Sequence, residues 1–413
     1  MRLILLAWLL CGWLLWSSYP LLAHEAERYF DAGVHAFSQG SLQEAIAHLN
    51  RAISSYPGYA QAHFMLARVY YEQHDYARAQ QALQRALAAY PTYAEAHYLL
   101  ALAYYQQQNS RAAEDAARQA VNAYPRYEEA YTLLATLAER RGALPQALES
   151  YRQVAKLNPK NVDALFRLAI ILEKLDKPTD AKLIYQQVLT QDPTHTDARL
   201  RLGLLAELQH QPQEAITLYQ SILQRQPNHV DTLQRLAALY QNAGNTEAAM
   251  ATYTRLLEVD AQRAEAALEL GLLYEQQENA AAAERTYKQA IKVRPGYAEA
   301  HYLLAVLYNK QNRLEEAMAT LQQALQAQPE HAESHFTLGT LYVKQKQYEK
   351  AIAEFEMALA TRPDFREAHY SLGVCYEFYL PNVAKALQHY RQFLAMGGKD
   401  TRVEQLVEYS KER

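Results

Sequence analysis

Apolar and small side chains recur along this chain at a fixed interval of 34 residues. When units are counted from Ala26, eleven copies fit within residues 26–399; the seventh residue is leucine in ten of them, and the eighth is always glycine or alanine. Proline occupies the thirty-second place of nine units: Pro57, Pro91, Pro125, Pro159, Pro193, Pro227, Pro295, Pro329 and Pro363. A period of this length indicates a stack of identical supersecondary units, which grows by addition rather than by enlarging one core.

Within each unit the pattern predicts two helices joined by a turn. The small eighth residue faces an alanine at place 20 in ten copies, which lets the helices cross closely, and a bulky residue at place 24 fills the space beside the crossing. Proline at place 32 cannot continue the second helix, and Gly40, Gly142 and Gly244 mark the turn between the helices. The chain is therefore predicted to be all-α, an α-solenoid of helix-turn-helix repeats.

Two irregularities interrupt this pattern. Ala261 stands where the seventh unit should carry its proline, so we expect the second helix of that unit to end less sharply. The eleventh unit contains one extra residue near Pro381, which moves its place-20 alanine to Ala386.

The recurring Leu-Gly/Ala, Tyr, Ala, Tyr/Phe and Pro at this period resemble the tetratricopeptide repeat. The resemblance implies a right-handed superhelix whose concave groove is lined mainly by the first helices. Residues 400–413, with Val403, Leu406 and Val407 at helical spacing, are then expected to form a capping helix. The chain departs from the family at place 4, where tryptophan is common, since five copies carry histidine: His63, His97, His301, His335 and His369.

The first 23 residues do not share the period. Arg2 precedes an unbroken apolar run from Leu3 to Trp16, and the segment ends at Ala23, which is the pattern of a secretory signal. The run is shorter than the roughly 20 residues that span a membrane, although counting on to Ala23 nearly reaches that length. Residues 1–23 are therefore predicted to be a cleaved signal peptide or a retained signal anchor. Either would place the repeats outside the cytoplasmic membrane, in the periplasm or anchored with the array on the outer side.

Composition excludes several functional classes. The net charge of −4 lacks the basic excess typical of a nucleic-acid-binding protein. The two cysteines, Cys11 and Cys375, leave no disulfide within the array, and Cys375 is expected to be a small buried hydrophobe. The sequence contains no phosphate-binding glycine loop, nucleophile elbow or HExxH motif, and its carboxylates are spread along the repeats. We therefore predict no enzymatic activity and no cofactor.

The place-4 histidines raise the question of a metal site. Equivalent residues of neighbouring repeats should lie about 8–10 Å apart, which is too far for one ion. No two histidines show the i, i+4 spacing with a third ligand that a zinc site requires. These histidines are therefore predicted to be packing residues.

Places 5 and 12 should face the groove, and they carry aromatic rings near both ends of the array. The candidate binding residues there are Phe64, Arg68, Tyr71, Tyr98, Tyr105 and Phe166 toward the start, and Tyr302, Phe336 and Tyr370 toward the end. Rigid rings on a concave surface are good anchors for a peptide. The alternative is that these rings simply pack between neighbouring helices.

In the middle of the array, place 6 carries arginine in three successive repeats. Arg167, Arg201 and Arg235 each follow an aspartate by four residues: Asp163, Asp197 and Asp231. Such pairs stabilise a helix by about 0.2–0.5 kcal/mol, which is the simpler interpretation. The other is a ladder of guanidinium groups suited to carboxylates or carbonyls of a ligand. The asparagine ladder and the Lys/Asn carboxylate clamp known in the family are not found at the matching positions.

These observations leave three functional hypotheses. The first is an exported, non-enzymatic scaffold that binds protein or peptide partners in its groove during assembly of a membrane or secreted complex. The second is a subunit of a polysaccharide export system that binds a carbohydrate polymer by stacking on Tyr and Phe. The third is a regulatory module of a larger enzyme.

Overall fold

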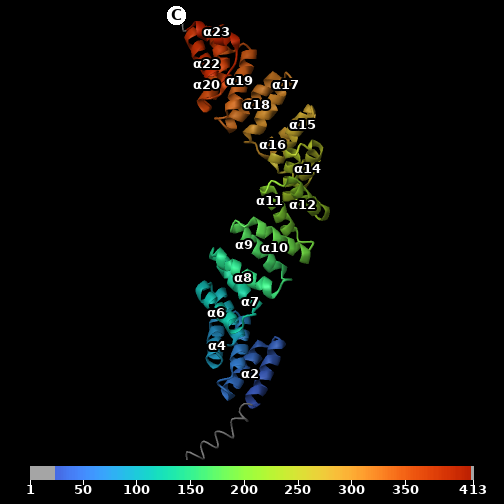
Figure 1. The fold of residues 1–413 in the computed structure, drawn as a ribbon, viewed down its shortest axis with the longest axis vertical. Coiled ribbons are helices and arrows are strands. Elements are labelled where there is room, and N and C mark those ends of the chain that lie inside the picture. The colour runs from blue at the N-terminus through green and yellow to red at the C-terminus, as the bar shows by residue number, and fades with distance from the viewer. Residues whose placement is uncertain (1–23, 411–413) are drawn as a thin grey trace, which may run out of the picture. The chain divides into compact units, whose positions relative to one another are not determined.

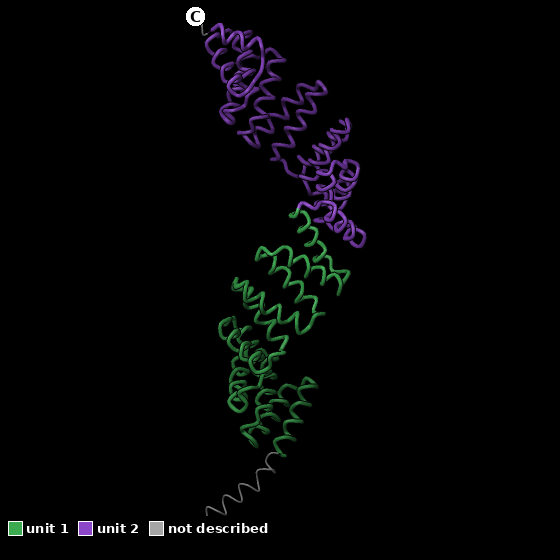
Figure 2. Tube along the Cα trace, in the orientation of Figure 1, with its two compact units in different colours: residues 1–209 green, residues 210–413 purple. Residues whose placement is uncertain are grey.

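The computed structural model describes residues 24–410, so the predicted leader, residues 1–23, lies outside the described residues. Over that range the chain is all-helical, and consecutive helix pairs stack as a solenoid, as the sequence predicted (Figure 1). The chain divides into two compact units, residues 1–209 and 210–413 (Figure 2). The division falls in the turn inside the sixth repeat.

Unit 1 holds five complete repeats and the first helix of the sixth. Its first helices are residues 24–38, α3 (Ala60–Glu72), α5 (Ala94–Gln106), α7 (Glu128–Arg140), α9 (Val162–Lys174) and α11 (Thr196–Leu208). Its second helices are α2 (Leu42–Ser55), α4 (Tyr76–Ala89), α6 (Ser110–Ala123), α8 (Leu144–Leu157) and α10 (Pro178–Gln191).

Unit 2 begins with α12 (Pro212–Arg225), the second helix of the sixth repeat. Its first helices are α13 (Val230–Asn242), α15 (Ala264–Gln276), α17 (Ala298–Lys310), α19 (Ala332–Lys344) and α21 (Arg366–Val374). Its remaining second helices are α14 (Thr246–Val259), α16 (Ala280–Val293), α18 (Leu314–Ala327), α20 (Tyr348–Thr361) and α22 (Val383–Ala395). A last helix, α23 (Thr401–Tyr409), follows them.

The predicted close crossing of helices is present in the core. Gly271 and Gly339 lie directly against the rings at place 24, because a Cβ added to them would meet Tyr287 at 2.5 Å and Phe355 at 2.7 Å. In three repeats the tyrosine at place 24 (Tyr151, Tyr253 or Tyr287) also donates its hydroxyl to the side chain at place 12 of the same repeat. Tyr287 donates to Glu275 over 2.9 Å, which ties the second helix to the first.

Residue 15 of each of the first ten repeats adopts a positive φ, which reverses the chain between the two helices. Three of these residues are glycine and the other seven are not, as in Glu278 at φ 56°. The left-handed conformation costs an L-residue roughly 1–2 kcal/mol, so the turn is strained in most copies. The residue after it caps the second helix in four of these repeats through an Asp or Asn side chain: Asp75, Asn109, Asn245 and Asn279.

Replacing Gly244 by alanine is expected to destabilise unit 2 by about 1 kcal/mol. Gly244 has φ 72°, and no atom lies within 4 Å of an added Cβ, so the change isolates backbone strain. Urea unfolding followed by far-UV circular dichroism measures it. The matched variant Glu278→Gly should instead leave the unfolding midpoint unchanged or raise it. Equal losses in the two variants would contradict this account of the turn.

Both irregularities have a local structural outcome. The expectation of a softer helix end at Ala261 was wrong, because α14 ends at Val259 at the same place as its counterparts. Asp260 fixes this turn by accepting the backbone N–H of Gln262 at 3.1 Å and pairing with Arg263 at 2.8 Å. The extra residue near Pro381 follows a π-helical turn, Cys375–Tyr379, which is how a helix commonly absorbs an insertion.

The end of the array is covered by α23, which packs on α22 and buries Val403 and Val407. Cys375 is buried beneath these helices, and burial raises the pKa of its thiol to about 11. Between residues 24 and 410, none of the helices is long and apolar enough to cross a membrane.

Candidate partner-binding surface

The first helices carry a row of polar side chains that joins one repeat to the next. Neighbouring first helices contact each other directly, as α3 does with α5 and α17 with α19. Lysine at place 13 reaches back to place 12 of the preceding repeat: Lys174 lies 3.2 Å from Glu139, and Lys310 lies 2.5 Å from Glu275. These links hold the exposed face of the first helices in a fixed arrangement.

Arg167 and Arg201 do not form the predicted pairs within their own helices. Arg201 contacts Glu173 of the preceding repeat at 3.3 Å rather than Asp197. Burial raises the pKa of Glu173, and Arg201 partly offsets that effect. Arg201 pairs with Glu173 because place 12 of the preceding first helix lies beside place 6, whereas Asp197 is exposed to solvent. Arg167, Arg201 and Arg235 are all exposed, and the guanidinium ladder stays a hypothesis.

The place-5 rings are half-buried, and most of them pack on a second ring in the turn that closes the repeat. Phe64 lies 4.9 Å from Tyr93 and Tyr98 lies 5.0 Å from Tyr127, measured between ring centres. Three other candidates form the same contact at 4.7–5.3 Å: Phe166 with His195, Tyr302 with His331 and Phe336 with Phe365. Tyr370 instead packs at 5.0 Å on Phe393, which lies within the second helix α22. Each ring therefore has one face occupied by its own chain.

The remaining candidates of the early groove lie apart from these ring pairs. Tyr71 packs edge-on against Tyr76, the first residue of α4. Arg140 lies 4.6 Å from the centre of the Tyr105 ring. Arg68 is exposed and extends over Phe37 of the first repeat at 5.3 Å. The candidate residues at places 5, 9 and 12 thus lie on neighbouring first helices, but they do not line a single pocket.

Histidine at place 4 fastens each helix to the proline turn before it. Nε2 of His63 donates to the carbonyl oxygen of Pro57 at 2.9 Å, and His301 does the same to Pro295. His97, His335 and His369 repeat the bond with Pro91, Pro329 and Pro363 at 2.8–3.2 Å. The histidines therefore have a structural role. Among the described residues, no three His, Cys, Asp or Glu side chains lie close enough together to hold a metal ion.

An open cavity of about 330 Å³ lies between the first helices α13 and α15 in unit 2. Its polar lining is fixed by hydrogen bonds: Gln241 donates to Glu269 at 2.8 Å, and Tyr253 donates to Gln241 at 2.9 Å. Sequence reasoning missed this cavity. The sequence feature that could have indicated it is Ala238, a small residue at place 9, where the repeats on either side carry leucine.

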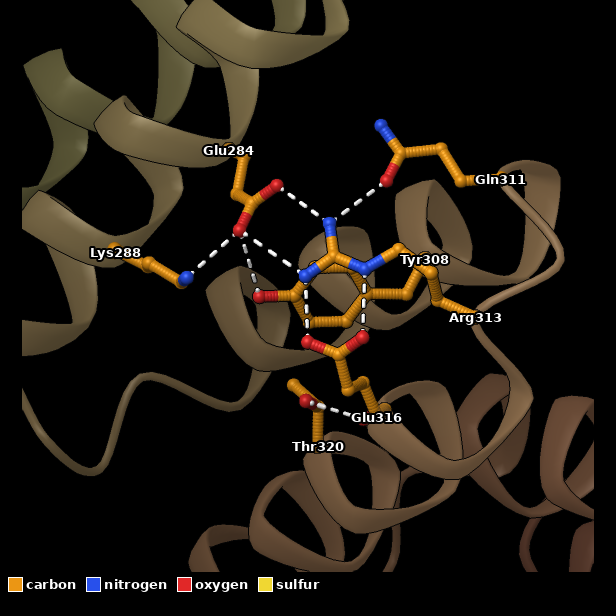
Figure 3. Close-up of polar contacts among 7 residues, drawn as sticks. All are labelled: Glu284, Lys288, Tyr308, Gln311, Arg313, Glu316 and Thr320. Carbon is orange, nitrogen blue, oxygen red and sulfur yellow. Dashed lines mark hydrogen bonds and ion pairs between the residues drawn. The ribbon is translucent and has the colours of Figure 1, made fainter.

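The second helices carry a different kind of cluster (Figure 3). Arg313 lies between Glu284 of α16 and Glu316 of α18, at 2.7 Å and 2.5 Å, with its guanidinium over the Tyr308 ring at 4.0 Å. Lys288 also contacts Glu284 at 2.7 Å. Arg313 and these neighbours lower the pKa of Glu284 to about 2. Because every charge in the cluster is paired, it can join two repeats but offers little to a ligand.

Tetratricopeptide repeat models match the chain at residues 36–85, 64–128, 139–208, 206–270, 270–332 and 309–375. No curated protein matches it.

Solved structures resemble the chain at low identity. The Cut9–Hcn1 part of the APC/C is 16% identical, covers 93% of this chain and 96% of its own, and gives a TM-score of 0.41. YrrB, described as a TPR protein with an unusual peptide-binding site, is 21% identical over 45% of this chain and 96% of its own, with a TM-score of 0.41. Pseudomonas aeruginosa PilF is 19% identical over 52% and 99%, with a TM-score of 0.42. Since the repeat models cover more than half of the sequence, the chain belongs to the tetratricopeptide repeat family.

Proposed function

We propose that this protein is a non-enzymatic scaffold that binds an extended segment of a partner protein on the exposed face of its first helices. The observation that carries the proposal is the cavity between α13 and α15. Its amide and carboxylate groups, Gln234, Gln241 and Glu269, are the groups that pair with the main chain of a peptide. The hydrogen bond from Gln241 to Glu269 and the one from Arg263 to Gln234 hold these groups in place before a ligand arrives, which lowers the entropic cost of binding.

Filling the cavity tests this proposal. Ala238→Phe places a ring in the cavity, whereas Ala251→Phe adds the same ring at an exposed position of the second helix α14. Affinity capture from detergent-solubilised envelopes, followed by mass spectrometry, should recover the same partner with the wild type and Ala251→Phe. Ala238→Phe should reduce its recovery about tenfold, equivalent to roughly 1.4 kcal/mol. Recovery that is equal in both variants would refute binding at the cavity.

The place of action is proposed to be the cell envelope. The support is the apolar run Leu3–Trp16, which precedes the described residues. All three tryptophans lie in this run, so a protein cleaved after Ala23 contains none. Tryptophan fluorescence of the purified native protein therefore distinguishes a cleaved leader from a retained anchor. A tryptophan-containing protein found only in the cytoplasmic fraction would refute export.

A further inference from the structure

Unit 1 carries a series of tyrosines in the turns that close its first three repeats, and none of them is among the candidate groove residues predicted from the sequence. The sequence Tyr-Pro-x-Tyr closes each of the first three repeats, and we call its six tyrosines the tyrosine ridge: Tyr56, Tyr59, Tyr90, Tyr93, Tyr124 and Tyr127. The first tyrosine of each turn is exposed, at 41%, 52% and 51% for Tyr56, Tyr90 and Tyr124. Large aromatic side chains that are this exposed at equivalent places of successive repeats indicate an interaction surface.

The second tyrosine of each turn is held rigidly. Tyr59 packs on Phe30 at 5.1 Å, in the same way as the ring pairs described above, and the ring of Tyr56 lies 6.0 Å from that of Tyr59. The corresponding distances to the exposed tyrosine are 5.6 Å in the second turn and 6.1 Å in the third. Each turn thus presents a fixed ring from the core beside an exposed one.

Carboxylates border the ridge without partners of their own. Burial raises the pKa of Tyr59 and Tyr127, and Glu27 and Glu95 raise it further, which places these carboxylates close to the two rings. In residues 24–410 neither glutamate forms an ion pair, and Arg126, in the third turn, does not pair with Glu95. A fixed ring beside an unpaired carboxylate suits a cation.

Unit 2 shows which cation fits this arrangement. In the turns that close the eighth and tenth repeats, arginine replaces the first tyrosine. Arg362 lies 3.6 Å from the centre of the Phe365 ring and pairs with Glu333 at 2.6 Å. Arg294 likewise lies over Tyr297 at 4.7 Å and pairs with Glu265. The ring and the glutamate stand at places 34 and 2 of these repeats, which are the places of Tyr127 and Glu95 in the third repeat and of Tyr59 and Glu27 in the first.

We infer that the tyrosine ridge binds arginine side chains of an extended segment of a partner protein, with one guanidinium at Tyr59 and Glu27 and another at Tyr127 and Glu95. The second repeat has Gln61 in place of the glutamate and provides only rings. Helix packing places equivalent residues of neighbouring repeats about 8–10 Å apart, so the two sites are separated by roughly 16–20 Å. An extended chain covers that distance in about six residues. The partner segment should therefore carry two arginines about six residues apart.

This inference rests on the proposed role in protein binding but uses a surface of unit 1, whereas the proposed groove cavity lies in unit 2. The test uses a fluorescein-labelled peptide of Gly, Ser and Ala with two arginines six residues apart, and the same peptide with lysine or glutamine at those two positions. Fluorescence polarisation with the full chain should show the arginine peptide binding at least tenfold more tightly than the glutamine peptide. Lysine should give an intermediate affinity, because its ammonium group lacks the planar stacking of a guanidinium.

Two variants locate the site. Glu95→Gln removes one carboxylate without changing its shape, and Tyr124→Arg supplies an internal arginine of the kind that fills the site in the eighth and tenth repeats. Each should weaken the arginine peptide about tenfold. Glu72→Gln removes an exposed charge elsewhere in unit 1 and should leave the affinity unchanged. Unchanged thermal unfolding of the two site variants would show that the loss is not caused by misfolding.

Three results would overturn the inference: equal binding of the glutamine peptide, wild-type affinity in both Glu95→Gln and Tyr124→Arg, or competition by dextran that is unaffected by Glu95→Gln. The last would assign the ridge to sugar stacking. Ala238→Phe should not change peptide affinity, so a failure of the cavity and a failure of the ridge can be told apart.

Discussion

Phe355→Ala is expected to destabilise unit 2 by about 3–5 kcal/mol, because it removes a ring that fills the crossing of two helices. Phe355 is 1% exposed and stands against Gly339, which has no side chain to move into the vacated space. The ring also packs on Phe336 at a centroid distance of 5.6 Å, so its loss loosens the place-5 ring of the same repeat. Hydrogen exchange resolved by repeat is the measurement of choice, since an array need not unfold in one step.

Met357 provides the matched control on the same helix. It is 49% exposed, and Met357→Ala should change stability by less than about 0.5 kcal/mol. Similar losses in the two variants would show that helix propensity, rather than the filled crossing, governs stability here.

A second variant separates size from polarity at this position. Tyr253 donates its hydroxyl to Gln241 at 2.9 Å, and Tyr287 donates to Glu275, but place 12 of the tenth repeat is Val343. Phe355→Tyr should therefore bury an unpaired hydroxyl and cost about 1–3 kcal/mol. Adding Val343→Glu should recover part of that loss. If the double variant is no more stable than Phe355→Tyr alone, the hydrogen bond is not what selects tyrosine at place 24.

The last repeat is expected to lose about 2 kcal/mol of stability as the pH falls from 6.5 to 4, through His389. Burial of its ring, followed by the neighbouring His369, 3.0 Å away between Nδ1 atoms, and Lys385, lowers the pKa to about 4. The unfolded chain therefore takes up a proton that the folded chain resists. The stabilising contribution is complete above the unfolded pKa of 6.5 and disappears as the pH falls through the folded value.

Urea unfolding at a series of pH values between these limits measures this loss, and His389→Gln should flatten the dependence. His335 acts in the opposite sense. Burial alone would lower its pKa, but Glu354, at 2.6 Å, and the Pro329 carbonyl outweigh burial and raise it. Its contribution is therefore present below pH 6.5 and is lost as the pH rises through the folded pKa. The comparison should accordingly be made in a His335→Gln background. A pH dependence that is the same with and without His389 would contradict the prediction.

Much of the architecture follows from periodicity alone. The leucine and small residues at places 7 and 8, the alanine at place 20 and the proline at place 32 act within one unit or between neighbours, so a single unit is enough to define their geometry. That is why the order of the helices and the all-α solenoid could be predicted. The expectation of a less sharp helix end at Ala261 was wrong because a proline is only one way to end a helix, and the turn at Asp260 is another.

Side-chain partners were less predictable, because a charged side chain can meet a partner in its own helix or in a neighbouring repeat, and the sequence does not distinguish the two. Asp197 lies four residues before Arg201, yet the carboxylate that meets Arg201 is Glu173, 28 residues earlier. The sequence left open whether the groove aromatics are free, and in the structure a ring from the closing turn contacts five of them: Phe64, Tyr98, Phe166, Tyr302 and Phe336. The cavity between α13 and α15 depends on a missing side chain at Ala238, which carries no chemistry of its own.

Short-range periodicity alone establishes that this protein is a stack of helix pairs, which residues form the core and where each pair ends. Which charges and rings already have partners, and which remain available, depends instead on the folded array. That distinction arises where side chains from different repeats meet, as when Arg362 occupies Phe365 and Glu333 in the tenth repeat while Tyr127 and Glu95 in the third have no arginine. Ligand binding depends on the groups that have no partner within the chain, and the sequence does not show which these are. The fold could therefore be predicted from the sequence, whereas the tyrosine ridge could not.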